Sequence, residues 1–256
     1  MFDTHVNLHG EAFADDLEDV LNRARSAGIA RFLAICDRLD SFPAVFDIAN
    51  ANEDMWCSVG VHPHNAKDFP DLRPENLIEK AANPKVVAIG ETGLDFHYNY
   101  SDEAAQIRSF KAHIHAARET GLPLIIHSRD ADDLMADILE EEAKVGAFKL
   151  LLHCYTGELS LAERALKLGA FFSVSGILSF KNAHNVRDVI SKLPPEQIIL
   201  ETDCPYLAPV PYRGRRNEPA YLPSVCKAYA DLIDRPAEEV ASMTEANALR
   251  LFDKVS

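Results

Sequence analysis

The stretch "SDEAAQIRSFKAHIHAARETGLPLIIHSRDA" (Ser101–Ala131) contains one structural unit of the predicted fold. Its first part carries apolar residues at helical spacing, and Gly121 is a typical residue to end such a helix. The apolar run that follows predicts a buried strand, which ends at His127. A helix followed at once by a short buried strand is the repeating unit of an α/β protein with a parallel sheet.

The same alternation extends along the whole chain. The predicted strands are Phe2–Val6, Ala30–Cys36, Met55–Val61, Lys85–Glu91, Leu122–His127, Phe148–Cys154, Ala170–Ser175 and Gln197–Asp203. Amphipathic stretches such as "ADDLEDVLNRARSAG" lie between them, and two more helices, about Ala220–Ile233 and Ala237–Phe252, complete the outer layer. Eight such units in 256 residues predict an α/β fold, a single (β/α)8 TIM barrel over residues 1–256 with additional C-terminal helices. A doubly wound open sheet is the alternative, because a sequence pattern does not show closure.

The composition narrows the class of protein. Hydrophobic residues make up 47% of the chain, which is enough for a substantial core. Apolar runs such as "KLLLHCY" are too short to span a bilayer, and no basic region followed by an apolar one suggests export. Five cysteines without a C-x-x-C motif indicate reduced thiols, so we expect a cytoplasmic protein with no membrane partner. A net charge of −14 argues against broad, non-specific binding of nucleic acid.

Metal-competent side chains stand where the predicted strands stop. The active site of a parallel α/β barrel lies at the C-terminal ends of its strands. Six of the eight strands end at, or run into, such side chains: His5, His62 with His64, Glu91, His127, His153 and Asp203. A single histidine at a strand end is more often a hydrogen-bonded core residue. Together, at one rim, these residues favour a metal site.

The mixture of donors indicates the kind of site. Imidazoles and carboxylates bind a divalent cation and leave positions open for water and substrate. Three histidines and two carboxylates suit two ions about 3.5–4 Å apart with one bridging carboxylate. We expect Glu91 to be the bridge and His127 and His153 to complete one ion. His5 and Asp203 would hold the other ion, and they are neighbours only if the barrel closes.

Several motifs resemble those of the TatD family of metal-dependent deoxyribonucleases, within the amidohydrolase-like superfamily. They are "VGVHPH", "VVAIGETGLDF", "LPLIIHSRDA", "LLHCYTG", "SVSGILSFKNA", "LETDCPYLAP" and "RGRRNEPAYL", in the family's order along nearly the whole chain. The resemblance implies hydrolysis of phosphodiester bonds in DNA, in single strands or at 3′ ends, with one or two divalent ions (Mg, Mn or Zn). It implies the metal ligands His5, Glu91, His127, His153 and Asp203, and His62 as a contact to the substrate phosphate.

The opening segment "FDTHVNLHG" (Phe2–Gly10) departs from the family pattern. Many members have His-x-His on the first strand, whereas this chain has His5 followed by Asn7. An amide oxygen can bind a hard cation but is a weak donor to zinc. We therefore expect Asn7 to be a weak ligand and the first ion to be loosely held. His9 lies beyond the strand and is expected to be a loop histidine in water.

Further residues are candidates for the reaction itself. Asp203 would orient the attacking water or take its proton, with Glu91 as the shared carboxylate. The candidate cations for the phosphate are Arg129, Arg213, Arg215 and Arg216. The alternative for the last three is a solvated loop that pairs with nearby acids such as Glu218.

Three features beside the ligands have structural alternatives. The aromatic residues of "GLDFHYNY" (Phe96, His97, Tyr98 and Tyr100) either stack bases or pack over the barrel. Glu201 lies two residues before Asp203, so it shares the inward face and can support a ligand. Cys154 and Cys204 directly follow ligands and are therefore expected to point away from the site.

Other functions are compatible with the same barrel. One is a hydrolase of another ester, such as a D-aminoacyl-tRNA deacylase or a small-molecule amidohydrolase. Small-molecule hydrolases of this superfamily often carry a carbamylated lysine on strand four, where this chain has Glu91. Another is a non-catalytic metal-binding protein, against which the intact ligand set argues.

Overall fold

A computed structural model describes residues 1–255. Over this range eight strands form one parallel sheet in the order of the sequence. They are β1 (Phe2–Val6), β2 (Arg31–Ala34), β3 (Met55–Val59), β4 (Val86–Asp95), β5 (Leu124–Arg129), β6 (Leu150–Leu152), β7 (Phe171–Val174) and β8 (Ile198–Leu200). The parallel order confirms the predicted succession of strand and helix units.

The first strand meets the segment that follows the last one, so the sheet is a nearly closed barrel. Val6 forms a parallel bridge with Cys204. The backbone N–H of Asp203 donates to the carbonyl of His5 (3.0 Å), and that of Asn7 donates to the carbonyl of Cys204 (2.9 Å). These bonds confirm the barrel, and the open-sheet alternative is wrong.

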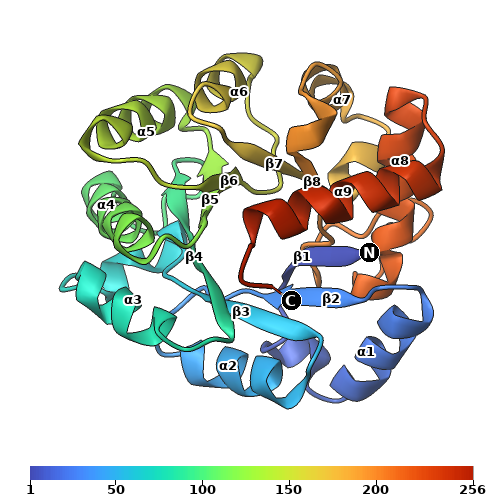
Figure 1. Cartoon of the computed structure of the whole chain (residues 1–256), viewed down its shortest axis with the longest axis horizontal. Coiled ribbons are helices and arrows are strands. Elements are labelled where there is room, and N and C mark those ends of the chain that lie inside the picture. Colours follow the sequence, from blue (N-terminus) through green and yellow to red (C-terminus); the bar gives the residue numbers. More distant parts are fainter. Residues whose placement is uncertain (256) are drawn as a thin grey trace.

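Helices surround the strands (Figure 1). They are α1 (Leu17–Ser26), α2 (Phe42–Ala51), α3 (Pro74–Ala81), α4 (Glu103–Thr120), α5 (Asp132–Val145), α6 (Leu159–Leu166), α7 (His184–Ile190), α8 (Leu222–Ile233) and α9 (Ala237–Leu251). Gly121 ends α4 with a φ of 69°, in the left-handed region that glycine adopts without strain. No helix in residues 1–255 has both the length and the apolar character that crossing a bilayer requires.

The strands place alternate side chains inside and outside the barrel. Leu33 packs in the cluster inside the barrel, whereas its neighbour Phe32 packs in the larger cluster that includes the surrounding helices. Both faces are buried, which is why the strands are apolar throughout. Ile125 also packs inside, so His127, two residues later, faces inward as well.

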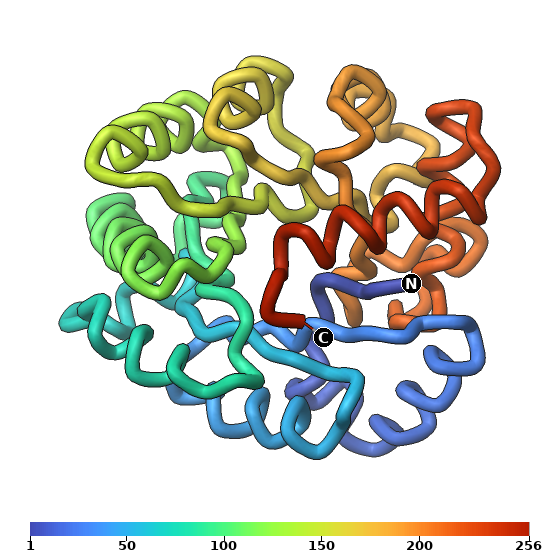
Figure 2. Tube along the Cα trace, in the orientation of Figure 1, coloured from blue at the N-terminus to red at the C-terminus, as the bar shows by residue number. Residues whose placement is uncertain are grey.

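The last helix closes the N-terminal end of the barrel. Leu251 and Phe252, at its end, pack with Phe2 in the cluster inside the barrel. The amide of Asn247 donates to the carbonyl of Ile198, at the start of β8 (2.8 Å). In Figures 1 and 2 this helix crosses the ring of strands instead of joining the outer layer. The expectation that α9 belongs to the outer layer is therefore wrong, and the opposite end of the barrel is the one available for a site.

Candidate metal centre

A cavity of about 1090 Å³ opens at the C-terminal ends of the strands. Four of the five predicted ligands line it: Glu91, His127, His153 and Asp203. His5 lies next to them and is fully buried. The strand order thus brings together side chains that are up to 198 positions apart in the sequence, from His5 to Asp203.

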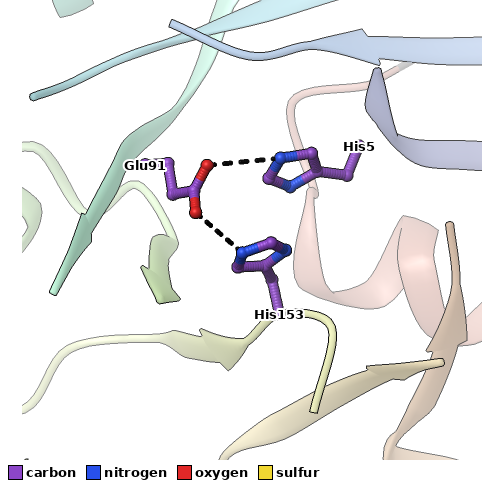
Figure 3. Close-up of side chains that lie close together, drawn as sticks. All are labelled: His5, Glu91 and His153. Atoms are coloured by element: carbon purple, nitrogen blue, oxygen red, sulfur yellow. Dashed lines mark ion pairs between the residues drawn. The ribbon is translucent and has the colours of Figure 1, made fainter. Parts of the chain in front are cut away.

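Glu91 lies at the centre of four histidines. Its Oε2 is 3.3 Å from His5 Nε2, and its Oε1 is 2.7 Å from His153 Nε2 (Figure 3). The same Oε1 is 3.2 Å from His127 Nδ1 and 3.4 Å from His62 Nε2. Two groups that can hold a metal ion therefore share this one carboxylate. The grouping differs from the predicted one, because His153 lies with His5 and because His62 joins His127.

The donors in this centre fit a divalent ion. Neither ring nitrogen of His5, nor Nε2 of His153, has a hydrogen-bond partner within residues 1–255, although all three atoms are buried. The two rings stack with their centroids 4.1 Å apart. Burying polar atoms without partners is costly, and ligation by a metal ion would remove that cost. Imidazole nitrogens that converge on one carboxylate are the donor set of such an ion.

The shared carboxylate is ionised. Burial alone would raise the pKa of Glu91, but the interactions of its carboxylate with His153, His62 and His127 outweigh burial and hold that pKa well below its usual value. Burial also lowers the pKa of His153, yet the charges of Glu91 and Glu201 leave it well above the ordinary range. Positive charge on the imidazole of His153 therefore balances the negative carboxylates of this centre. A bound cation would balance them in the same way.

Glu201 orients one of the candidate ligands. Its Oε1 is 3.3 Å from His153 Nδ1, and the hydroxyl of Ser173 donates to its Oε2 (2.7 Å). With an ion bound at Glu91, a proton on Nδ1 of His153 would leave the Nε2 lone pair free to bind that ion. Glu201 is fully buried and faces the site, which agrees with its predicted inward position.

Asp95, which was not among the predicted site residues, has the same relation to His127. Its Oδ2 is 3.0 Å from His127 Nε2 and 2.8 Å from His64 Nε2. A proton on Nε2 of His127 leaves Nδ1 free to face Glu91. The missed signal was the period of two, because positions 91, 93 and 95 share one face of β4, which continues to Asp95 instead of stopping at Glu91.

His62 has a proton-donating edge toward Glu91. Its Nδ1 accepts the backbone N–H of His64 (3.2 Å), so a neutral ring carries its proton on Nε2, which faces Glu91. Burial lowers the pKa of His62 to about 4, which favours the neutral ring. His62 also lines the cavity. A neutral imidazole with an N–H on this edge suits a phosphate oxygen better than a metal ion.

Asn7 holds Asp203 through a hydrogen bond. Its Nδ2 lies 3.3 Å from Asp203 Oδ1 and 3.2 Å from the carbonyl oxygen of Cys204. A carbonyl oxygen only accepts, so the amide nitrogen must face both groups. In this structure Asn7 thus contacts Asp203 through its amide nitrogen, and its expected role as a weak metal ligand through the oxygen stays a prediction. Burial raises the pKa of Asp203 to about 6, and His5 Nε2 lies 3.6 Å from its carboxylate.

The predicted cations separate into two groups. Arg129 lines the cavity, whereas Arg213, Arg215 and Arg216 are not among the residues that line it. Arg216 is paired with Asp16, its NH1 and NH2 lying 2.8 and 2.7 Å from the two carboxylate oxygens. Arg129, and not the loop arginines, therefore lines the cavity that contains Glu91.

Two side chains near the ligands differ from expectation. His9 is not a solvated loop residue, because its Nε2 lies 3.1 Å from Asp37 Oδ1. Cys154 lines the cavity instead of pointing away. The backbone of Cys154 turns to a φ of 44° directly after His153, and this places its sulfur 3.1 Å from Ser175 Oγ. The five cysteines are free thiols, and Cys204 is buried.

Comparison with known proteins places the chain among similar sequences and structures. The family model described as TatD related DNase matches residues 2–253. An uncharacterized metal-dependent hydrolase of Bacillus subtilis, YabD, is 36% identical over 252 residues, with 98% of each chain covered. The 3′-5′ ssDNA/RNA exonuclease TatD of Escherichia fergusonii is 35% identical over 259 residues, with 98% of each covered. The crystal structure of YjjV, a TatD homologue from Escherichia coli, has a TM-score of 0.88 at 29% identity, covering 99% of this chain and 98% of that one.

Proposed function

Because this chain belongs to the TatD-related DNase family and is a metal-dependent hydrolase, we propose that it removes nucleotides from the 3′ end of single-stranded DNA. The observation that carries the proposal is the convergence of four histidines on the single carboxylate of Glu91 in an open cavity. Relatives at 34–35% identity that cover almost the whole chain bear the name 3′-5′ ssDNA/RNA exonuclease, which supports this substrate and polarity.

The ligands of the metal would be the residues that surround Glu91. His5 and His153 would bind with Glu91 on one side, where Asp203, 3.6 Å from His5 Nε2, would complete the set. His127 would bind with Glu91 on the other side. When bound, divalent ions lower the pKa of water and neutralise the charge of a phosphodiester. Asp95 and Glu201 would keep the imidazoles in the tautomers that offer a lone pair to the centre.

The chain's own residues have distinct tasks in this proposal. Asp203 accepts a proton from the water that attacks phosphorus, and Asn7 holds its carboxylate in place by the hydrogen bond to Oδ1. The Nε2–H of His62 donates to a phosphate oxygen. The guanidinium of Arg129, which lines the same cavity, balances the negative charge of the phosphate.

The direct test uses a single-stranded oligonucleotide labelled at its 5′ end. With magnesium, manganese or zinc we expect a ladder of products that shortens one nucleotide at a time from the 3′ end. Chelation should abolish the ladder, and metal should restore it. A D-aminoacyl-tRNA incubated under the same conditions is the control for another ester substrate. Absence of hydrolysis with every metal, or internal cleavage alone, would contradict the proposal.

Asp203→Asn tests the assignment of the base. The substitution keeps the size of the side chain and removes its basic oxygen, so kcat should fall by roughly 10²-fold or more. Metal analysis should still find metal bound through Glu91, His127 and His153, whereas replacing either of those histidines by alanine should lower the metal content. Normal turnover in Asp203→Asn would show that another group takes the proton.

A further inference from the structure

We propose that Tyr98, Tyr100 and Arg129 form a subsite that stacks an unpaired nucleobase and holds the adjoining phosphate beside the metal centre. The inference rests on the proposed function, because it names the part of a single-stranded nucleic acid that this cavity wall would recognise. It also selects between the two roles that the sequence leaves open for the aromatic residues after Glu91.

Two tyrosines make a flat aromatic surface in the cavity wall. The rings of Tyr98 and Tyr100 are parallel within 11°, with centroids 5.5 Å apart. Both line the cavity that contains Glu91, and they are 47% and 56% exposed. His64 contacts both rings edge-on, with centroids 5.4 and 4.8 Å away. Phe96, in contrast, packs against the core, so the exposed aromatic surface in this segment belongs to the tyrosines.

The segment that carries the tyrosines is fixed at both ends. The backbone N–H of Tyr98 donates to Asp95 Oδ1 (3.0 Å), and the hydroxyl of Ser101 donates to the carbonyl of His64 (2.8 Å). The amide of Gln106 donates to the carbonyls of Asp95 (3.0 Å) and Ser101 (2.9 Å). The backbone that carries the rings is therefore held in place before a ligand arrives, which reduces the entropic cost of binding.

The carboxylate of Asp95 contacts both the segment that carries the tyrosines and a histidine of the metal centre. Asp95 accepts the backbone N–H of Tyr98 with Oδ1 and faces His127 Nε2 with Oδ2 (3.0 Å). A base stacked on the tyrosines would thus lie on a segment whose position is set by the residue that orients a metal ligand. Stacking and the placement of the phosphate at Glu91 would be geometrically linked.

A free cation completes the subsite. The guanidinium of Arg129 lies 4.8 Å from the ring centroid of Tyr98. It has no hydrogen-bond or ion-pair partner in the part of the chain that the structure describes, and among those residues it is the one lysine or arginine that lines the cavity. The acidic residues Glu11 and Asp37 also line the cavity, but they follow β1 and β2, which are not neighbours of β5, the strand that Arg129 ends. A polyanion would therefore be attracted to the part of the wall with Arg129 and repelled by the part with Glu11 and Asp37.

The ligand that fits is a base with an open face. The tyrosine rings are already in offset contact, so a base would stack on their exposed side and not between them. Bases in a duplex have both faces covered, whereas those of a single strand or a frayed end do not. Stacking on aromatic side chains is tolerant of sequence, because every base has a π-face. We therefore expect a subsite for single-stranded nucleic acid without base preference.

The experiment measures binding separately from hydrolysis. Single-stranded oligonucleotides carry 2-aminopurine at one of the last three positions, and its fluorescence is quenched on stacking. They are titrated with Asp203→Asn protein in manganese, next to Asp203→Asn/Tyr98→Leu and Asp203→Asn/Tyr100→Leu. At one position we expect strong quenching, and each tyrosine substitution should weaken binding about 5-fold or more. Phe42→Leu, which removes a half-buried ring from α2 outside the cavity, is the matched control and should leave binding unchanged.

An abasic nucleotide at the quenched position shows whether the tyrosines contact the base. The abasic oligonucleotide should bind the parent weakly, and the tyrosine substitutions should then cause no further loss. Equal losses on the abasic and intact oligonucleotides would overturn the subsite, and so would failure of the parent to bind either one. If binding depends on the base but the wild-type protein hydrolyses no oligonucleotide, the subsite stands and the proposed function is wrong.

Discussion

One oxygen atom of Asp95 faces two imidazoles. His64 Nε2 lies 2.8 Å and His127 Nε2 lies 3.0 Å from Oδ2. The side chain of Asp95 is completely buried. Burial raises the pKa of Asp95, but the hydrogen bonds from His127 and His64 outweigh it and lower the pKa below its usual range. An ionised carboxylate behind an imidazole fixes the ring and increases its basicity toward a metal ion.

Asp95→Asn tests this positioning role. Asparagine has one accepting oxygen, so it cannot serve both the imidazoles at Oδ2 and the backbone N–H of Tyr98 at Oδ1, and it lacks the negative charge. His127 should therefore lose its preferred tautomer. Metal affinity should fall by about 10- to 100-fold, and kcat at low metal should fall with it. Asp130→Asn is the matched control, because Asp130 is an exposed carboxylate 2.9 Å from His97 Nδ1. Calorimetric titration with manganese distinguishes the two variants, and equal affinity in Asp95→Asn and wild type would show that Asp95 is only structural.

The sequence predicts the identity of the polar residues better than the direction of their side chains. Glu91 and His127 could be placed at one rim because the strand pattern fixes where the backbone ends. The amide of Asn7 could not be oriented, since its partners Asp203 and Cys204 lie almost 200 positions away. The pairing of Arg216 depends in the same way on a distant residue.

At the scale of elements, β4 is longer than predicted, because it continues past Glu91 to Asp95. The predicted strand ends at Glu91, and the residues after it include Gly93 and Asp95, types that are depleted in strands. Gly93 is needed there because its φ is 139° and because a Cβ would collide with the backbone carbonyl oxygen of His127. The close approach extends the pairing of β4 with β5 as far as Arg129. Tertiary contact therefore overrides the local preference.

A buried histidine joins α4 to the end of β3 and gives a pH dependence. His113 Nε2 accepts the backbone N–H of Val61 (2.9 Å), and Nδ1 donates to the carbonyl of Ser109 (2.7 Å). Burial lowers the pKa of His113 to about 4. In the unfolded chain the pKa of this histidine is about 6.5. Between pH 6.5 and 4 the unfolded chain therefore binds a proton that the folded chain does not. The contribution to stability is complete above pH 6.5 and is lost as the pH falls toward 4.

His113→Gln should flatten this dependence. Glutamine can accept and donate as the neutral ring does, but it does not titrate. In chelator, the free energy of unfolding of the wild type should fall by on the order of 3 kcal/mol more than that of His113→Gln between pH 7 and 4. Denaturant titrations at several pH values measure the difference. His115→Gln, two residues away and 53% exposed, should follow the wild-type curve. Parallel curves for His113→Gln and wild type would rule out His113 as the titrating group.

At the scale of the whole molecule, the two ends of the barrel have separate tasks. The cavity with Glu91 occupies the C-terminal end, and the end of α9 closes the other through Phe252, which is fully buried and lies 5.9 Å from the ring of Phe2. The sequence indicates that α9 is amphipathic, but its apolar face fits a barrel end as well as a barrel wall. The strand pattern alone did not show closure of the barrel, but the predicted ligands His5 and Asp203 favoured it, because they converge only in a closed sheet.

Phe252→Ala should therefore affect stability without affecting chemistry. Removing a buried phenylalanine costs about 3–5 kcal/mol, through lost burial and the cavity left behind. Thermal unfolding should shift to lower temperature, while kcat at a temperature where the variant is folded should match the wild type. Phe42→Ala, at a half-buried ring, should lose less stability. A large drop in kcat of fully folded Phe252→Ala would mean that the two ends are coupled.

The charge distribution of the whole molecule predicts a weak salt dependence of nucleic-acid binding. The chain has a net charge of −14, and Arg129 is the one lysine or arginine that lines the cavity in residues 1–255. For single strands the logarithm of affinity falls with the logarithm of salt concentration by about 0.7 per neutralised phosphate. With one or two contacts, affinity for an oligonucleotide should fall only about 3- to 7-fold between 50 and 200 mM salt.

Arg129→Gln should reduce the slope by about 0.7, whereas Arg215→Gln, outside the cavity, should leave it unchanged. Fluorescence titrations of Asp203→Asn protein at fixed manganese give these slopes. A steep slope that survives Arg129→Gln would mean that the strand is held by cations outside the cavity, and the loop of Arg213, Arg215 and Arg216 would then be the first place to substitute.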